Sequence, residues 1–512
     1  MSALPAQPAS SASSVRASSL TEGVLILLAL TVVQRLVGFL RGILFCRWLD
    51  AEQLGQWDMA FNFLVLASPL AVLGLPGSFG RYAETYRDQG VLRTFLRRTT
   101  LASLLPAVLF CLALVAAAPW TADLLFGTQE ETSLVYVIAA TLTAVIVFNY
   151  LTSLFMALRS TRIVSYLQFI NTILFAAIGL GLMYAGRVDA ESAVAAFGGA
   201  CFISCVLAFF WVVRLWRELP RDEPNLSHGT LWSKLLPFAF WVWVVNWIAN
   251  SFEMADRYMI IHYGNLAPHE ALALVGQYHT ARVIPTLIVG LADMFGALLT
   301  PHLAKSWEAG ERENVAARLR FVLKLFVLLF LAASIVLVIA SPLFFHTALE
   351  DKFGFGQEIF PWTMACALWT GLAWISHNWL YCAEKSRLVC VGLSLGLATN
   401  VALNYLLLPT YGLSGVVIAA AAAKLTMLAV DLILCRALGM AVDRGLLVAA
   451  ALPAALIVGP WFALVALLAT ASGFIKPLAV FDSAERSQLG DAANQIARRL
   501  SSLVRRTPAA AR

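Results

Sequence analysis

The sequence predicts an all-α polytopic membrane protein, and three features support this fold class. Hydrophobic residues make up 60% of the 512 residues and charged residues only 13%, whereas soluble domains are nearer half apolar and a quarter charged. Apolar stretches recur from residue 24 to about residue 473, each with the ~20 residues that a helix needs to cross a ~30 Å hydrocarbon layer. The sequence lacks the short segments of alternating polarity that are typical of a transmembrane β-barrel.

Twelve of these stretches predict transmembrane helices, and the loops between them predict their orientation. The predicted spans are 24–46, 57–79, 99–119, 133–156, 163–185, 193–213, 235–262, 276–300, 321–341, 359–382, 388–408 and 414–435. Alternate connections, among them 80–98 and 301–320, carry nineteen Lys and Arg residues, whereas the other set carries three. Because basic loops stay on the cytoplasmic side, the sequence predicts a cytoplasmic N-terminus.

A short repeat relates the two halves of this helix set. The segment GQWDMA at 55–60 resembles GQYHTA at 276–281, and the same offset of 221 residues aligns Tyr86 with Trp307. Six spans separate the copies, so both run in the same direction across the membrane. Chance similarity is the alternative to duplication. We predict two six-helix bundles related by a parallel internal repeat, with a central cavity between them.

The spans and the composition between them divide the chain into six regions. These are a disordered tail at 1–20, an N-terminal bundle at 21–213, a cytoplasmic linker at 214–234, a C-terminal bundle at 235–436, an extra hydrophobic segment at 437–475 and a basic amphipathic tail at 476–512. A full crossing by the extra segment would place the basic tail outside, against the charge rule. Pro453 and Pro460 leave a broken or re-entrant segment open.

Several stretches, in their order and spacing, resemble the polysaccharide-exporter branch of the multidrug/oligosaccharidyl-lipid/polysaccharide (MOP) flippase superfamily, which includes O-antigen flippases. They are RLVGFLRGILFCRWLDAEQLGQWDMAFNF at 35–63, LGLPGSFGRYAE at 73–84, MADRYMIIHYG at 254–264, LVGQYHTARVI at 274–284 and NVALNYLLLPTYGLSGVVIAAAAAKL at 400–425. The likeness covers roughly residues 20–440. It implies two six-helix bundles in a bacterial inner membrane and outward movement of a lipid-linked saccharide by alternating access.

Four arginines within the predicted spans are candidates for binding an anionic substrate: Arg35, Arg41, Arg257 and Arg282. A charge at mid-bilayer costs ~2.5–3.5 kcal/mol on insertion scales, so it usually faces protein or water. Arg35 lies near the centre of the first span, with Gly38 and Gly42 close to its face. Its guanidinium either anchors a substrate phosphate through two-point geometry or forms a buried structural ion pair.

Three carboxylates are candidates for ion coupling or gating: Asp58, Glu253 and Asp256. Glu253 and Arg257 are four residues apart and are predicted to pair on one helix face. A purely structural ion pair is the alternative to a gating role. Asp58 and His279 occupy equivalent positions in the repeat, and a structural role is favoured for the histidine over titration near neutral pH.

The sequence favours transport over catalysis. It contains neither a nucleotide-binding P-loop nor a Gly-x-Ser-x-Gly motif, so we expect no catalytic residue, metal site or cofactor. The net charge of +6 is explained by the cytoplasmic loops, so no nucleic-acid partner is expected. The favoured function is a flippase that moves a lipid-linked, diphosphate-bearing saccharide from the cytoplasmic to the outer leaflet of the membrane. The energy would come either from an ion gradient, with a proton or a sodium ion as the coupling ion, or from substrate supply. The alternatives are a cation-coupled multidrug antiporter of the same superfamily and a membrane glycosyltransferase or ligase.

Overall fold

The computed structural model describes residues 20–219, 226–472, 479–482 and 485–487, and these residues contain helices and no β-strand. The first half of the chain forms α1 (Leu20–Trp48), α2 (Ala51–Ala71), η1 (Leu75–Ser78), α3 (Phe79–Asp88), α4 (Leu92–Ala116), α5 (Ala118–Phe126), α6 (Thr132–Ala157), α7 (Thr161–Tyr184) and α8 (Ala190–Glu218). The second half forms α9 (His228–Tyr263), α10 (Pro268–Glu308), α11 (Arg312–Leu349), α12 (Gly354–Cys382), η2 (Ser386–Leu388), α13 (Val389–Ala437), α14 (Arg444–Ala451), α15 (Ala454–Val458) and α16 (Pro460–Ser472).

The helices have the length and polarity of membrane spans, as predicted. Nine helices of the described chain are long and apolar enough to cross a membrane, or ten if α2 and α3 form one bent span. In addition, α1 covers the first predicted span, and α13 contains the last two, with a kink at Gly412. Leu105 and Leu112 of α4 remain 64% and 60% exposed, as expected for a helix face that contacts lipid tails.

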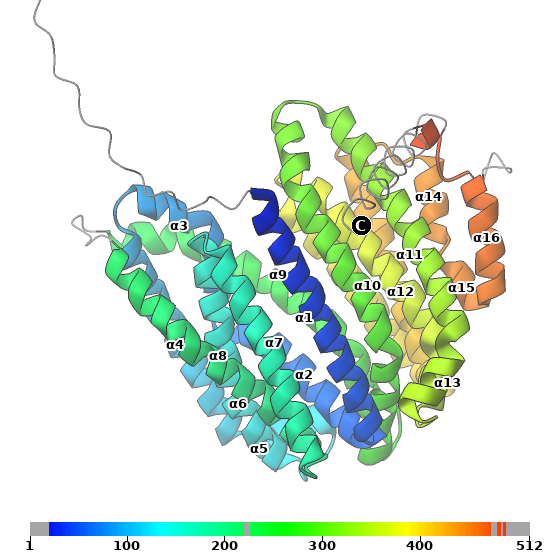
Figure 1. The fold of residues 1–512 in the computed structure, drawn as a ribbon, viewed down its shortest axis with the longest axis horizontal. Coiled ribbons are helices and arrows are strands. Elements are labelled where there is room, and N and C mark those ends of the chain that lie inside the picture. The colour runs from blue at the N-terminus through cyan, green and yellow to red at the C-terminus, as the bar shows by residue number, and fades with distance from the viewer. Residues whose placement is uncertain (1–19, 220–225, 473–478, 483–484, 488–512) are drawn as a thin grey trace, which may run out of the picture.

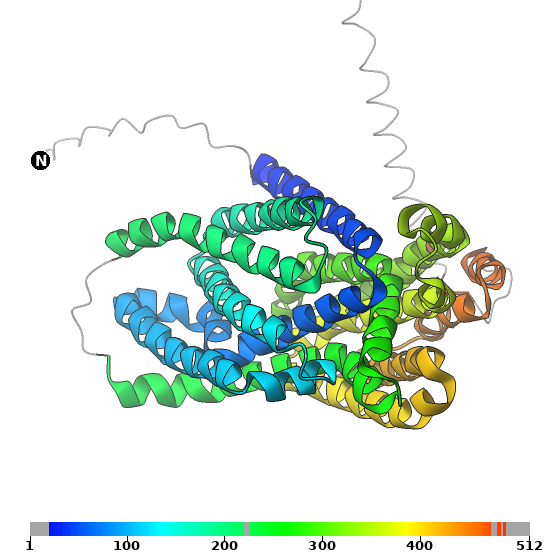
Figure 2. The ribbon, with the colours of Figure 1, turned by 90° about the horizontal axis from the view of Figure 1, so that it is seen from below.

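Two helical bundles lie side by side, which confirms the predicted fold class (Figure 1). Helices α1–α8 form one bundle and α9–α16 the other, and α2 packs against α9 and α10 where the bundles meet. The long helix α9 also reaches back beneath the first bundle (Figure 2). There Leu231 and Leu235 pack in one apolar cluster with Leu75 and Phe79. The predicted linker at 214–234 is therefore partly helical, since α8 extends to Glu218 and α9 begins at His228.

The predicted span at 57–79 is wrong as a single straight helix. Helix α2 ends at Ala71, and the chain then bends by 65° into η1 and α3. Leu73 and Gly74 have φ angles of 53° and 66°, a left-handed conformation that stops a helix. The bend brings Gly74 against α9, where a Cβ on this glycine would lie 2.8 Å from the carbonyl oxygen of Ala239. Packing between the bundles therefore fixes the position of the bend.

The extra hydrophobic segment does not cross the membrane as one helix. It is divided into α14, α15 and α16, with breaks before Pro453 and at Gly459. Val480, which follows α16 in the sequence, lies against Gly445 at the start of α14. A Cβ on Gly445 would lie 2.1 Å from the carbonyl oxygen of Val480. The fully buried Lys324 of α11 clamps both ends, with its Nζ 2.6 Å from Asp443 and 2.9 Å from Glu485. Residues 443–445, Val480 and Glu485 therefore lie on one face of the molecule, so the segment enters and leaves on the same side.

Two regional predictions cannot be compared with the fold. Residues 1–19 of the predicted N-terminal tail lie outside the described residues. The same holds for residues 488–512, which contain the predicted amphipathic helix face of the C-terminal tail.

Candidate functional site

Helices α2 and α10 meet at one end of the bundles through two glycines that are equivalent in the sequence repeat. A Cβ on Gly55 would lie 1.9 Å from the carbonyl oxygen of Leu272, and a Cβ on Gly276 would lie 2.0 Å from that of Ala51. Position 272 is position 51 plus the repeat offset of 221, so the two contacts are reciprocal. This is the pattern expected of a pseudo-twofold axis between the bundles. We call this backbone contact the closed end.

An ion-pair cluster lies beside the closed end and joins the two bundles. The Asp58 carboxylate of α2 accepts a hydrogen bond from Arg257 Nε of α9 at 2.5 Å. It lies 2.7 Å from Nδ1 of His279 on α10, its own equivalent in the repeat. Asp58 and Arg257 are only 2% and 4% exposed, and a buried pair of this kind is costly to break. The cluster therefore stabilises the conformation in which this end is closed.

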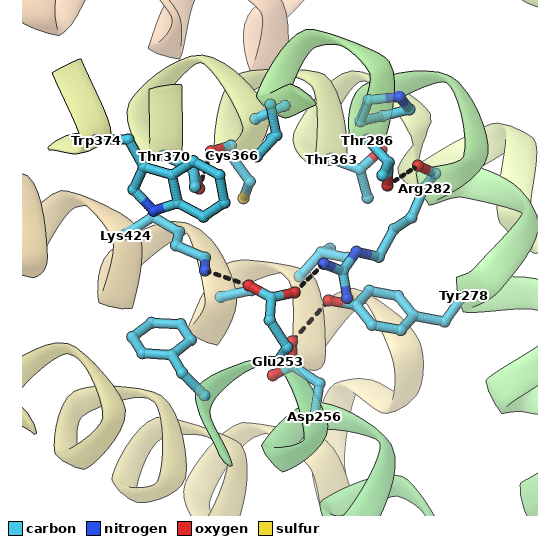
Figure 3. A pocket seen from close by; sticks show the side chains of 16 residues that line it. Glu253, Asp256, Tyr278, Arg282, Thr286, Thr363, Cys366, Thr370, Trp374 and Lys424 are labelled. Carbon is cyan, nitrogen blue, oxygen red and sulfur yellow. Dashed lines mark hydrogen bonds and ion pairs between the residues drawn. The ribbon is translucent and has the colours of Figure 1, made fainter. Parts of the chain in front are cut away.

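The predicted side-chain pair between Glu253 and Arg257 is wrong. Arg257 reaches Asp58 instead, and one of its Nη atoms donates to the backbone carbonyl of Glu253. The Glu253 carboxylate lies between Arg282 of α10 and Lys424 of α13 and forms ion pairs with both (Figure 3). The Lys424 Nζ to Glu253 Oε1 distance is 2.9 Å. Local spacing predicted the i, i+4 partner, but partners from other helices surround both side chains.

Asp256 occupies a separate buried network inside the second bundle. Its carboxylate accepts hydrogen bonds from the Tyr278 hydroxyl at 2.6 Å and from the amides of Asn400 and Asn404 at 2.8 and 3.0 Å. No described basic side chain pairs with it. Asn404 Oδ1 is buried and has no hydrogen-bond partner among the described residues. Sequence reasoning missed these two asparagines as partners, although their i, i+4 spacing in an apolar helix was a usable signal.

A central cavity of about 540 Å³ lies between the bundles. Its lining comes from α1, α2, α7, α8, α9 and α10, and it brings together all four predicted arginines with Asp58 and Glu253. Asp256 instead lines a smaller cavity of about 240 Å³ in the second bundle, shown in Figure 3. The Arg282–Glu253 ion pair borders both spaces. Four arginines face two carboxylates around the central cavity, so its charge is basic.

Arg35 and Arg41 differ from the other two arginines because no described carboxylate pairs with either of them. The Arg41 guanidinium lies 3.8 Å above the centre of the Phe175 ring, which leaves its N–H edge available to a ligand. Arg35 is exposed to the cavity, and its Nη1 would lie 3.1 Å from a Cβ on Gly290 of α10. The structural ion pair that was one of the two alternatives for Arg35 is absent from the described part of the chain.

An apolar groove of about 210 Å³ lies between α1 and α10, and Arg35 is one of its lining residues. Val32, Leu36, Leu287 and Leu291 are among its walls. Arg35 therefore lines both this apolar groove and the basic central cavity. The junction suits an amphiphile whose anionic group separates a polar part from an apolar part.

The fold and this cavity define an α-helical membrane protein with the two-bundle architecture of MOP-superfamily transporters. Residues 20–307 match the family model described as "Polysaccharide biosynthesis protein". Since this match spans more than half of the chain, the protein belongs to the polysaccharide biosynthesis protein family, as the sequence resemblance predicted.

Solved structures support the fold. The lipid II flippase MurJ in an inward closed conformation matches with a TM-score of 0.62 and 14% identity, over 86% of this chain and 95% of that chain. An inward-facing MATE-family multidrug resistance transporter matches with a TM-score of 0.60 and 14% identity, over 79% and 94% of the two chains. A MOP-superfamily transporter from Pyrococcus furiosus, described as having a binding pocket of reverse polarity, matches with a TM-score of 0.59 and 12% identity, over 82% of this chain and 94% of that chain. No curated protein matches this chain.

Proposed function

We propose that this protein is a flippase that moves a lipid-linked, diphosphate-bearing oligosaccharide from the cytoplasmic to the outer leaflet by alternating access. The observation that carries the proposal is the position of Arg35, at the junction of the basic cavity and the apolar groove. A prenyl diphosphate saccharide has the same order of parts, with the apolar tail, the diphosphate and the polar sugar in sequence. A guanidinium matches phosphate oxygens in two-point geometry.

Two features favour transport through the observed cavity. The closed end seals one side of it by backbone contact between α2 and α10, so a rocking of the bundles is needed to expose the cavity on that side. The basic loops of 80–98, 301–320 and 436–444 lie together along the opposite edge (Figure 1). With these loops in the cytoplasm of a bacterial cell, the cavity of this conformation receives cargo from the inner leaflet of the cell membrane, and the N-terminus is cytoplasmic.

The charge of the cavity weighs against the main alternative. A drug antiporter that exports cations is served by unpaired acids, whereas the free side-chain charges here are those of Arg35 and Arg41. The third candidate, a membrane glycosyltransferase or ligase, is disfavoured by the outer connection predicted at 342–358. That connection is short because α11 extends to Leu349 and α12 begins at Gly354, which leaves little room for a catalytic loop.

The Asp256 network is our candidate for ion coupling. The Asp256 carboxylate accepts hydrogen bonds from three neutral donors and pairs with no described basic side chain, so no ion-pair partner competes with a bound cation there. The amide oxygen Asn404 Oδ1 adds an unpartnered acceptor beside it, and oxygen ligands are those that hard cations prefer. The expected result for Asp256→Asn is transport that no longer responds to an imposed proton or sodium gradient, while Arg35 still binds cargo.

The test of the function is reconstitution. Purified protein in proteoliposomes is given a fluorescent polyprenyl-diphosphate oligosaccharide in one leaflet, and its appearance in the other leaflet is measured with a membrane-impermeant quencher. We expect Arg35→Ala and Arg41→Ala each to lower the initial rate about tenfold or more, since charge-assisted contacts contribute ~1.5–3 kcal/mol. Arg187→Ala, at an exposed site on the outer α7–α8 connection, is the control. Normal rates in both cavity variants would reject the proposal.

A further inference from the structure

A second cleft opens between the bundles at the basic edge of the molecule. It has a volume of about 820 Å³ and is larger than the central cavity. Its walls come from α3 of the first bundle, the first half of α9, and the turn through η2 that joins α12 to α13. These walls belong to the connections predicted to be cytoplasmic, or to helix turns adjoining them. We call this space the basic cleft.

Four cations line the basic cleft, and a single acidic residue, Glu384, accompanies them: Arg81, Lys234, Lys385 and Arg387. None of these four side chains forms an ion pair or a hydrogen bond with a described residue. Arg257, Arg282 and Lys424, by contrast, each pair with a carboxylate. The cleft therefore holds a surplus of positive charge, and like charges lie together without compensation, at a cost to the fold.

Aromatic rings of α9 stack with the two arginines of the cleft, which come from α3 and from η2. The Arg81 guanidinium lies 5.0 Å from the Phe238 ring centre, and that of Arg387 lies 5.0 Å from the Trp241 ring centre. Stacking orients a guanidinium and leaves its N–H edge free for an anion. The wall that carries Arg81 is held to α9 by the Tyr82 hydroxyl, which donates to the Lys234 carbonyl at 3.2 Å. The donors are thus positioned before any ligand binds.

The surroundings of the cleft are those of a lipid headgroup. Pro237, Val242 and Val245 give its floor an apolar character, and α9 exposes Phe240, Trp241 and Trp247 by 55%, 38% and 48%. Exposed Trp side chains beside Lys and Arg are typical of the membrane–water interface. We propose that the basic cleft binds the phosphate-bearing headgroup of a membrane lipid through Arg81 and Arg387. This site is distinct from the central cavity and does not depend on transport.

The experiment measures equilibrium binding with two lipid probes. The purified full chain is titrated in detergent with polyprenyl diphosphate or with phosphatidylglycerol, and bound lipid is counted by native mass spectrometry. We expect Arg81→Gln/Arg387→Gln to weaken binding about tenfold or more. The control is Arg93→Gln/Arg312→Gln, because each of these arginines also lies 5.1 Å from a tryptophan ring centre but outside the cleft. Lys234→Gln/Lys385→Gln serves as a second test if the arginine variant does not fold.

The outcomes separate the two sources of phosphate. A loss confined to polyprenyl diphosphate supports the site as a dock for a lipid-linked cargo, whereas an equal loss for both lipids supports a site for bulk anionic lipid. Unchanged binding of both lipids overturns the proposal, and so does an equal loss in the control variant, which would indicate a general surface-charge effect. Polyprenyl diphosphate also binds the central cavity if the flippase proposal holds, so the titration is repeated on an Arg35→Ala background, where only the cleft contribution is expected to remain. Failure of the flippase proposal and failure of this one are then distinguishable.

Discussion

The glycine pair of the closed end leads to a quantitative prediction about the balance between conformations. A Cβ in Gly55→Ala would lie 1.9 Å from the Leu272 carbonyl oxygen. Non-bonded carbon and oxygen atoms rarely approach closer than ~3.3 Å, so α2 and α10 would have to separate by about 1.4 Å at this point. The obstacle is backbone on a partner helix, which cannot rotate away as a side chain can. Gly276→Ala meets the Ala51 carbonyl in the same way.

Overpacking of this kind costs ~1–3 kcal/mol. The cost falls on the conformation in which α2 and α10 touch, because separated helices give the methyl group free space. A bias of that size changes the ratio of the two conformations by about 5–150-fold. The reciprocal geometry further predicts that the two single variants shift the ratio by similar factors.

Double electron–electron resonance between spin labels at positions 129 and 358 measures the separation of the two bundles at the closed end. Both positions are exposed and lie in different bundles, and the eight native cysteines are replaced first. We expect either glycine variant to move population from the short to the long distance. Gly181→Ala is the matched control, since this helical glycine has no atom within 4 Å of an added Cβ. An unchanged distance distribution in both variants, or an equal shift in the control, would refute the reasoning.

Three further variants test other contacts. Asp58→Asn leaves the buried Arg257 without its carboxylate and should destabilise the closed conformation by ~3–5 kcal/mol relative to the open one. Adding Arg257→Gln should restore part of the population with the short distance between the spin labels. Lys324→Met removes the ion pairs to Asp443 and Glu485, so Val480 and Glu485 should exchange amide hydrogens faster while transport continues. Burial and the nearby acids raise the pKa of Glu131 in the α5–α6 connection. A raised carboxyl pKa makes the ionised form unfavourable in the fold, so Glu131→Gln should raise the melting temperature at pH 7. This advantage should shrink as the pH falls through the raised pKa of the folded protein, and it should be gone once the pH is below ~4.3, the pKa of an unperturbed glutamate.

Patterns of hydropathy and charge were sufficient to predict the helices and the repeat. Each depends on residues that are near one another in sequence, or on a comparison of two segments at a fixed offset. The bend after α2 could not be predicted from such patterns, because Leu73 adopts a left-handed φ only where Gly74 packs on α9. The course of the C-terminal hydrophobic segment could not be predicted from the sequence for a similar reason. Its course is fixed by Lys324 and Val480, which contact residues more than thirty positions away.

The partners of the site residues were the least predictable feature. Asp58 and Arg257 are 199 residues apart, and only the packing of α2 against α9 brings them together. The spacing rule for one helix gave Arg257 the wrong partner, because it considers only residues of that helix. All four predicted arginines line the central cavity, in agreement with the rule that intramembrane charges face protein or water.

The repeat also explains why the closed end can be both tight and reversible. A symmetric axis places each residue opposite its own equivalent, so a charged residue kept in both copies would face a like charge. Here the equivalent positions hold Asp58 and His279, which pair at 2.7 Å, and Gly55 and Gly276, which need no side-chain space. The two copies therefore differ at this axis in a way that makes the contact attractive. Arg35 and Arg41 on α1 have no carboxylate partner among the described residues, whereas Arg257 of α9 and Arg282 of α10 form ion pairs. Under the proposed flippase function, the unpaired arginines of the first bundle are available to an anionic cargo, while the Arg257–Asp58 pair between the bundles holds the closed end.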